Sequence, residues 1–331
     1  MSGTPAVSGP RLRSDAVGPD LVAVGEALVA FIATDGLPLT EATAFRRTVA
    51  GAEFNVAAAM ARLGHRAVFA GRVGADPHGQ VIEQRARTFG IDARLVRDVE
   101  AATGVLVRDV GDFRPTGVQY ARASSAGSRL CAQDLDFDLV ASARCVHVSG
   151  ITASLSDSAE AAVCEVMRRA RDAGVLVSFD PNLRWRMMDP QWARSSLPQL
   201  AGLASVLVAG ADELAWLADS DEGETALDWA FEQGVELVVV KRGEHGAMAS
   251  DGVARCEVPA RARRPVDVVG AGDAFAAGLL AGLLEGKSVE AAMADAAVVA
   301  AFVVSTVGDL EGLPDRDLRD SFSEDGGEVR R

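Results

Sequence analysis

The sequence predicts an α/β fold with a mainly parallel central sheet, helices on both faces of that sheet, and a small additional β segment. Apolar strand-like runs alternate with helical segments between residues 144 and 241, which is typical of a parallel sheet covered on both sides. Between residues 93 and 122 two strand-like runs follow each other with no helix, which predicts a hairpin outside this alternation. The length of 331 residues suits one large α/β domain with a small appendage, or two domains.

The two ends of the chain differ from the rest in composition. Residues 1–20 are rich in Gly, Pro, Ser and Ala without hydrophobic periodicity, so we expect a disordered leader. Residues 315–331 are polar, with clusters of Asp, Glu and Gly, and we expect a tail that frays. The folded domain is therefore predicted over residues 21–314.

The first half of this domain contains the predicted hairpin. Helical spacing of apolar residues over 52–63 predicts a helix that stops at Gly64, a good C-cap residue. Pro77 marks the start of a second helix, which runs to residue 89. Strands are predicted at 21–25, 28–33, 67–71, 103–110 and 117–122.

The second half alternates strands with helices. The strand at 175–180 ends in Asp180-Pro181-Asn182, at the sheet edge where α/β proteins bind ligands. Residues 246–249 and 253–258 predict a second hairpin. Further strands are predicted at 144–149, 206–209 and 236–241, and helices at 157–173, around Glu213, at 274–285 and at 288–307.

Composition excludes several classes of function. With 33 Lys and Arg against 47 Asp and Glu, the net charge of −14 argues against nucleic acid or an anionic membrane as partner. No signal peptide opens the chain, and no apolar run reaches the ~18 residues that span a bilayer, so we expect a cytoplasmic protein. The cysteines are scattered and indicate neither a zinc site nor a disulfide framework; they are Cys131, Cys145, Cys164 and Cys256.

The stretch from Asp267 to Phe275 carries the clearest functional signal. A strand-like, β-branched approach gives way to Gly270-Ala271-Gly272 and then to a helix that is apolar nearly all round, and so predicted to be buried. The first turn of such a helix offers unpaired N–H groups to an anion, and the glycines let the anion come close. Asp273 beside this anion site is explained either as a catalytic base or as a helix N-cap.

Two motifs resemble those of the ribokinase-like (PfkB) family of sugar kinases. Asp267 to Asp273 is similar to the family's Asp-Thr-x-Gly-Ala-Gly-Asp, with Val268 in place of Thr, and residues 50–64 resemble its Gly-Gly-x-x-x-Asn-x-Ala motif. The resemblance covers residues 21–314. It implies a ribokinase-like three-layer sandwich with a small β lid, formed near 28–50 and 94–123, that covers the sugar and joins subunits into a homo-oligomer.

The resemblance also implies a catalytic apparatus that uses ATP and Mg²⁺. Asp273 would be the base, and the N–H groups of Gly270, Ala271 and Gly272 would stabilise negative charge. Glu213 would organise Mg²⁺, although Gly210 replaces the Asn that accompanies it in the family. The resemblance further implies a monovalent cation near Asp267. Nucleotide contacts are implied for Lys241, Gly243, Gly246, Gly270 and Gly272, and an adenine pocket for Ala297, Val304 and Gly308.

The substrate follows from a second set of residues. Residues 120–128, 147–152 and 180–184 resemble the 2-keto-3-deoxygluconate kinase group of the family, in which two arginines, here Arg122 and Arg184, face the carboxylate of a sugar acid. Leu106 stands where some of these enzymes have a tyrosine. Other residues implied to contact the sugar are Glu26, Gly51, Asn55, Tyr120 and Asp273.

Alternatives remain open for these side chains and for the function. Glu26 could be a solvated acid at a strand end, Asn55 could bond the local backbone, Arg122 could guard a strand edge, and Arg184 could be a surface charge. A fructokinase is the second hypothesis. A non-catalytic sugar sensor, which would explain Gly210 and Val268, is a hypothesis from another class.

Overall fold

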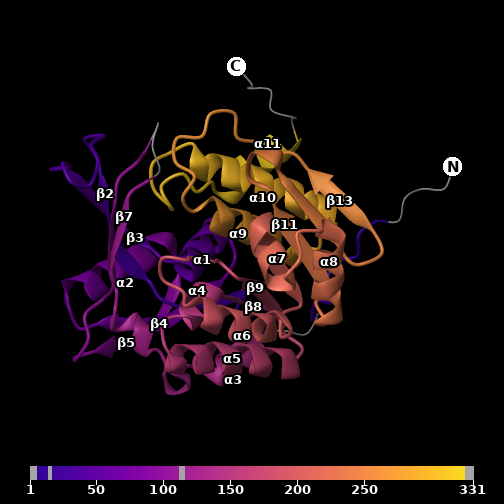
Figure 1. Ribbon diagram of the computed structural model, residues 1–331, viewed down its shortest axis with the longest axis horizontal. Helices are drawn as coiled ribbons and strands as arrows, with labels where there is room; N and C mark the ends of the chain where they lie inside the picture. Colours follow the sequence, from indigo (N-terminus) through magenta and orange to yellow (C-terminus); the bar gives the residue numbers. More distant parts are fainter. Residues whose placement is uncertain (1–5, 14–16, 112–115, 325–331) are drawn as a thin grey trace.

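The computed structural model describes residues 6–13, 17–111 and 116–324 of the chain. A nine-stranded sheet forms its centre (Figure 1). Neighbouring strands are parallel except at one edge of the sheet, where residues 247–250 and 255–258 form an antiparallel hairpin. In spatial order they are β13 (Arg255–Val258), β12 (Ala247–Ser250), β11 (Leu237–Lys241), β10 (Val206–Gly210), β9 (Leu176–Asp180), β8 (Cys145–Ser149), β1 (Leu21–Val24), β4 (Ala67–Gly74) and β5 (Asp92–Asp98).

Helices cover both faces of the sheet, which confirms the predicted three-layer sandwich (Figure 1). Alternate residues of β1 enter different cores, because successive side chains of a strand point to opposite faces. The first core contains α1 (Ala52–Arg62), α2 (Pro77–Phe89), α9 (Ala271–Leu284) and α10 (Val289–Val304). The second contains α3 (Phe137–Ser142), α4 (Gly150–Ala153), α5 (Asp157–Asp172), α6 (Pro190–Ala201), α7 (Ala211–Ala218) and α8 (Gly223–Glu232).

Helix α9 is buried from Ala274 onward, as its composition predicts. It packs tightly on α10, since a Cβ added to Gly278 would meet the Cα of Ala296 at 2.7 Å. The approach to α9 is a turn and not the strand-like segment that we expected. There the N–H groups of Val266 and Asp267 donate to the carbonyl of Val304, at 2.7 and 3.3 Å, instead of joining the sheet.

A separate four-stranded sheet, which we call the lid, confirms the predicted hairpin. Its spatial order is β3 (Phe45–Ala50), β2 (Leu28–Ala33), β6 (Val105–Arg108) and β7 (Val118–Ala121). The predicted lid segment at 94–123 begins too early, because residues 94–98 belong to β5 and pair with β4 in the main sheet. The loop at 112–115 lies outside the described residues.

Both ends of the described chain lie against the domain, which corrects the expectations for residues 6–13 and 316–324. The N–H of Ser8 donates to Asp251 (2.7 Å), and Nη1 of Arg13 donates to the carbonyl of Ala141 (2.9 Å). Residues 316–324 form the helix α11 (Arg316–Glu324), whose Arg319 is buried. Polar contacts are joined by apolar ones: Val7 and Leu12 pack against the first core, and the ring of Phe322 lies edge-on to that of Phe302, with 5.1 Å between the ring centroids. Among the described residues, no helix is both long and apolar enough to cross a membrane.

Candidate active site

The candidate active site lies at the carboxyl ends of the parallel strands, where ligands bind in open α/β sheets. Glu26 follows β1, Asp180 ends β9, and Lys241 ends β11. These residues line two cavities, both of which also contain Gly270 and Asp273 from the start of α9. Asp273 therefore lies where the two cavities meet.

Gly270 begins the site as the N-cap of α9 with a left-handed φ of 81°. A Cβ here would meet the Cα of Asp309 at 3.0 Å, so both the conformation and the close approach require glycine. The turn before it is closed by the N–H of Val269, which donates to Oδ1 of Asp267 (3.2 Å). The N–H of Ala271 donates to the carbonyl of Val268 at 3.3 Å, so this group is shared within the turn and not wholly available to an anion.

Asp273 lies inside the first turn of α9, half-buried, and is not its N-cap. Nδ2 of Asn55 donates to its Oδ2 (2.8 Å), which joins the two sequence motifs. Burial raises the pKa of Asp273 to about 7; Asp180 and Asp309 add to this rise, and Asn55 and Lys241 oppose it. A carboxyl group that titrates near neutral pH suits a general base, so the geometry favours the base over the capping role.

The smaller cavity is lined by all the residues predicted to contact a sugar. They come from the connection after β1, from α1 and its N-cap, from the lid, and from the loop after β9, and they are Glu26, Gly51, Asn55, Tyr120, Arg122, Arg184 and Asp273. In the lid, Leu106 pairs with Tyr120, and both side chains face this cavity. The alternative of a solvated Glu26 is wrong, since this residue is 1% exposed.

The two arginines differ in their surroundings. Arg122 is half-buried, with 9% of its side chain exposed, and forms an ion pair with Glu26, which also accepts a hydrogen bond from the hydroxyl of Ser125. Nε of Arg122 is buried without a partner among the described residues. Arg184 is exposed, donates to the carbonyl of Leu183 (3.0 Å), and has no carboxylate partner in the described part of the chain. Arg184 is therefore a cation available to a ligand.

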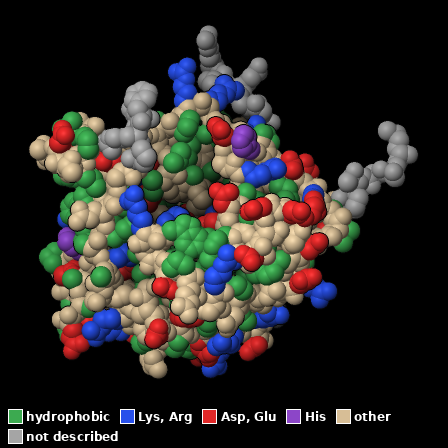
Figure 2. All heavy atoms as spheres, viewed as in Figure 1, with side chains coloured by type: hydrophobic (Ala, Val, Ile, Leu, Met, Phe, Trp, Pro, Cys, Tyr) green, Lys and Arg blue, Asp and Glu red, His purple; other side chains and the backbone are tan. Residues whose placement is uncertain are grey.

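The larger cavity, about 550 Å³, opens on the other side of Asp273. Figure 2 shows a hollow between the lid and the side of α9 and α10, with basic side chains at its floor. Nζ of Lys241 donates to Asp180 (2.5 Å) and lies within 3.3 Å of where a Cβ of Gly272 would be. Burial alone would lower the pKa of Lys241, but Asp180, Glu213 and Asp273 outweigh it and raise the pKa. The ammonium therefore stays charged beside the first turn of α9.

Glu213 lines the larger cavity, with both of its carboxylate oxygens held by backbone. It accepts from the N–H of Leu183 (2.8 Å) and from that of Gly210 (2.6 Å), at the start of α7. No cluster of acidic, His or Cys side chains that could hold a metal is present among the described residues. Glu213 fits an outer role toward Mg²⁺ that arrives with a nucleotide, because Mg²⁺ keeps several of its waters.

The residues around Asp267 do not fit a monovalent cation. The guanidinium of Arg108, from the lid strand β6, lies against Oδ2 of Asp267 at 2.6 Å. The same oxygen accepts the N–H of Gly308 (3.0 Å). A cation at this carboxylate would meet a fixed positive charge at hydrogen-bond distance.

Five residues predicted to bind the nucleotide lie outside both cavities. Gly243 and Gly246 are in the turn after Lys241, and Ala297 and Val304 face the core from α10. Gly308 lies beside Asp267. A third cavity, about 490 Å³, is lined by residues 259–263 and by Val298, Ala301, Phe302, Ser305 and Phe322. The adenine pocket at Ala297, Val304 and Gly308 stays a prediction.

Three residues of the site were missed from the sequence. Arg108 and Asp309 are buried and paired with each other (3.4 Å), and nothing in the local sequence marks either of them. Glu53 lines the smaller cavity and accepts the hydroxyl of Ser149 (2.5 Å), while burial raises its pKa to about 7. A charged residue in the first turn of a mostly apolar helix was the available signal for Glu53.

Comparison with known proteins matches this architecture to one family. The model of the pfkB family carbohydrate kinases aligns with residues 19–316. The chain is 34% identical to the 2-dehydro-3-deoxygluconokinase of Bacillus subtilis (strain 168), over 92% of this chain and 95% of that protein. It is 33% identical to the 2-dehydro-3-deoxygalactonokinase of Haloferax volcanii, over 88% and 92% of the two chains.

A solved structure gives the same picture. The fructokinase from Vibrio cholerae O395, crystallised in a form with bound fructose, ADP and calcium ion, superimposes with a TM-score of 0.82. The two sequences are 28% identical, and the match covers 94% of this chain and 100% of the fructokinase. The arrangement of main sheet and lid is thus that of known sugar kinases.

Proposed function

Because the chain belongs to the pfkB family of carbohydrate kinases, we propose that it transfers the terminal phosphoryl group of ATP to 2-keto-3-deoxygluconate, giving the 6-phosphate. This sugar acid is also called 2-dehydro-3-deoxygluconate. The observation that carries the proposal is Arg184, an arginine without a carboxylate partner among the described residues, which lines the cavity that holds the other predicted sugar contacts. A guanidinium binds a carboxylate through two parallel hydrogen bonds.

In the proposed reaction Asp273 takes the proton of the attacking hydroxyl. The hydroxyl oxygen bonds to the terminal phosphorus of ATP as the bond from that phosphorus to the ADP oxygen breaks. The N–H groups at Gly270 and Gly272 and the ammonium of Lys241 stabilise the charge that develops on the transferred group. Mg²⁺ bound with the nucleotide would neutralise phosphate charge, and Glu213 is the side chain that would face its water shell.

A fructokinase is the second candidate, and one contact favours it. Glu26 already neutralises Arg122, so one of the two predicted carboxylate ligands is occupied by the protein itself. The solved fructokinase that superimposes on this chain binds fructose, a neutral sugar. For the acid, Arg184 and the free Nε of Arg122 are the donors that remain.

Measurement of ADP release with each sugar separates the two candidates. We expect wild-type protein to prefer 2-keto-3-deoxygluconate over fructose. Loss of one charge-assisted hydrogen bond costs ~1.5–3 kcal/mol, so Arg184→Ala should lower kcat/KM for the acid by about one to two powers of ten. The change should act mostly through KM, and kcat/KM for fructose should hardly change.

Two further variants serve as controls. Arg184→Lys keeps the charge but not the planar fork, and should fall between wild type and Arg184→Ala. Arg186→Ala removes a neighbouring arginine that lines only the larger cavity, and should leave the preference for the acid unchanged. A wild-type preference for fructose, or an equal loss for both sugars in Arg184→Ala, would establish the fructokinase instead.

A further inference from the structure

Arg108 is a lid residue that reaches into the body of the protein. It ends β6, where it pairs with Ile32 of β2 and Val118 of β7. Its side chain is 2% exposed and is among the largest fully buried side chains of the described chain. Nη2 donates to Oδ2 of Asp267 (2.6 Å) and to Oδ1 of Asp309 (3.4 Å). The lid therefore places a permanent positive charge between two carboxylates of the body.

Both carboxylates belong to the site that receives the phosphoryl group. Asp267 closes the turn before Gly270 through the N–H of Val269. Asp309 packs against Gly270 itself and accepts a hydrogen bond from Asn55 (3.4 Å), the residue that also holds Asp273. Displacement of Arg108 would thus disturb the anion site and the base together, through Asp267 and Asp309.

The structure offers no cation other than Arg108 at Asp267 among its described residues. Oδ1 and Oδ2 of Asp267 accept N–H groups from Val269, Gly308 and Arg108, and each of these donors would repel a metal ion. Nη1 of Arg108 is buried with no partner in the described ranges. An unsatisfied buried donor weakens a purely structural role for the side chain, because desolvation of that donor is not compensated.

We propose that Arg108 is a positioning residue for phosphoryl transfer, and that its guanidinium replaces a monovalent cation beside Asp267. The inference rests on the proposed kinase activity. It predicts that turnover needs no monovalent ion, because the lid supplies the charge. It also predicts that the anion site is complete only when β6 lies against the body, which ties phosphoryl transfer to closure of the lid over the sugar.

The test compares wild type, Arg108→Ala and Arg108→Lys with tetramethylammonium or potassium as the monovalent cation, at equal ionic strength and with Mg²⁺ present. Potassium should change wild-type kcat by less than about twofold. Arg108→Ala should lose about 10²–10³-fold in kcat in tetramethylammonium, as when a group that stabilises the transition state is removed. Its KM for the sugar should stay within about threefold of wild type, whereas a collapsed lid would raise KM.

Recovery of kcat on addition of a cation distinguishes loss of a positive charge from general disruption of the fold in Arg108→Ala. Potassium or guanidinium should restore kcat of Arg108→Ala by about tenfold, and Arg108→Lys should exceed Arg108→Ala by a similar factor. Potassium should also raise the Tm of Arg108→Ala but not that of wild type, since a ligand of the folded state stabilises it. Arg47→Ala, which removes an exposed arginine from β3 of the same lid, should match wild type throughout.

Several results would overturn the proposal. They are strong activation of wild type by potassium, wild-type kcat in Arg108→Ala, and no recovery by potassium, guanidinium or lysine. If Arg108→Ala does not fold, the kcat of Arg108→Lys and the response of wild-type kcat to potassium still test the proposal. Absence of turnover by wild type in every buffer would reject the proposed kinase activity and not the role of Arg108. In that case, a rise of wild-type Tm with potassium would show that a monovalent ion binds in spite of Arg108, and would reject the role of Arg108.

Discussion

At the scale of single residues, the site is a balance of charges around Asp273. Asp180 and Asp309 lie near it as negative charges, and Lys241 offsets them while pairing with Asp180. Burial raises the pKa of Asp309, and Arg108 opposes that rise. The protein thus keeps carboxylates close together, at a cost to stability, at the point where proton transfer is proposed. Such raised pKa values are typical of functional sites.

The pKa of Asp273 sets a testable pH dependence. The base must be deprotonated, and its pKa is raised to about 7, so kcat/KM should rise with pH through about 7 and be lost below it. Asp273→Asn should remove this dependence and lower kcat by ~10²–10⁴-fold. The variant should be at least as stable as wild type at pH 8, because a raised pKa means that the folded state disfavours the charge.

Rate measurements across pH, with circular dichroism to confirm folding, check this prediction. Asp228→Asn, at an exposed position of α8, is the matched control and should behave as wild type. An acid limb near pH 4, or near-normal kcat in Asp273→Asn, would show that another group is the base.

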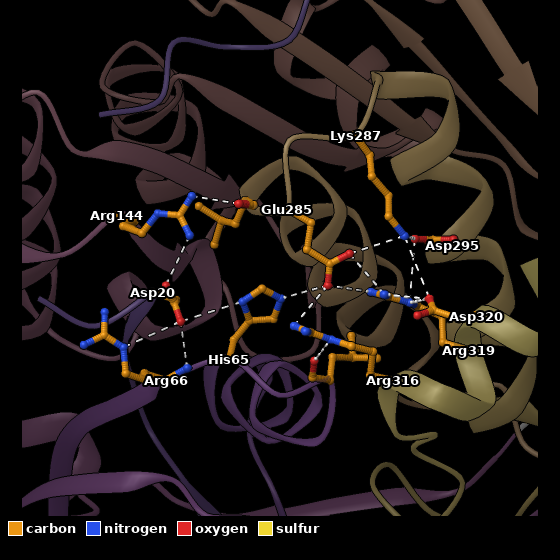
Figure 3. A network of polar contacts seen from close by, with 12 residues as sticks. Asp20, His65, Arg66, Arg144, Glu285, Lys287, Asp295, Arg316, Arg319 and Asp320 are labelled. Carbon is orange, nitrogen blue, oxygen red and sulfur yellow. Dashed lines mark hydrogen bonds and ion pairs between the residues drawn. The ribbon is translucent and has the colours of Figure 1, made fainter. Parts of the chain in front are cut away.

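At the scale of elements, Glu285 links the far end of α9 to its neighbours (Figure 3). It follows the last residue of α9 and contacts His65 (3.4 Å), Lys287 (3.3 Å), Arg316 (3.3 Å) and Arg319 (3.0 Å). Burial alone would raise the pKa of Glu285, but Arg319 and Lys287 outweigh it and lower the pKa. The charged carboxylate therefore stabilises the fold above the acid range and holds α11 in place.

Removal of this charge should destabilise the protein without impairing catalysis. Glu285→Gln should lower the free energy of unfolding by about 2 kcal/mol at pH 7, and the deficit should shrink as the pH falls and Glu285 is protonated in wild type. Urea denaturation at two pH values measures this. Glu165→Gln breaks a more exposed pair with Arg169 inside α5 and should cost less than about 0.5 kcal/mol. Equal losses in the two variants would remove the structural role given to Glu285.

The elements that could be predicted are those with a local signal. Periodic apolar residues located α1, Pro77 marked the start of α2, and two adjacent strand runs located the lid hairpin. The helix α11 was missed because its sequence is mostly polar and its place depends on Arg319 meeting Glu285 and on Phe322 meeting Phe302, which are distant in sequence. In the same way, the sequence motifs predicted Asn55 and Asp273, but not Arg108, whose partners come from another region of the chain. Ion pairs between remote residues have no local pattern.

At the scale of the whole molecule, the body and the lid differ in how they are held. The body has two large apolar cores, one on each face of the main sheet. The strands β2 and β3 contribute Val29 and Val49 to the first of these cores. The separate core of the lid is small and contains only Leu28, Ala30 and Ala50, with Leu106 packed on it, among the described residues. Polar ties to the body come from β3, where Arg46 donates to the carbonyl of Val307 and Thr48 donates to Glu311. They also come from Arg108 of β6 and from Arg122, which follows β7 and meets Glu26. Pairing of lids into a homo-oligomer remains a prediction.

Because the lid has the smaller apolar core, we expect a bound sugar to slow hydrogen exchange in the lid more than in the body. Few buried apolar contacts allow local opening, so backbone amides of β6 and β7 should exchange hydrogen faster than those of β8 to β11 in the free protein. Arg184, from the body, and Tyr120, from the lid, line the same cavity, so a sugar acid that touches both should slow exchange in β6 and β7 and leave the body unchanged. Hydrogen exchange followed by mass spectrometry measures this with 2-keto-3-deoxygluconate, and with fructose for comparison. Arg184→Ala should lose the protection given by the acid at the same concentration. Protection spread evenly over both sheets, or a lid as protected as the body before the sugar is added, would mean that body and lid open as one unit.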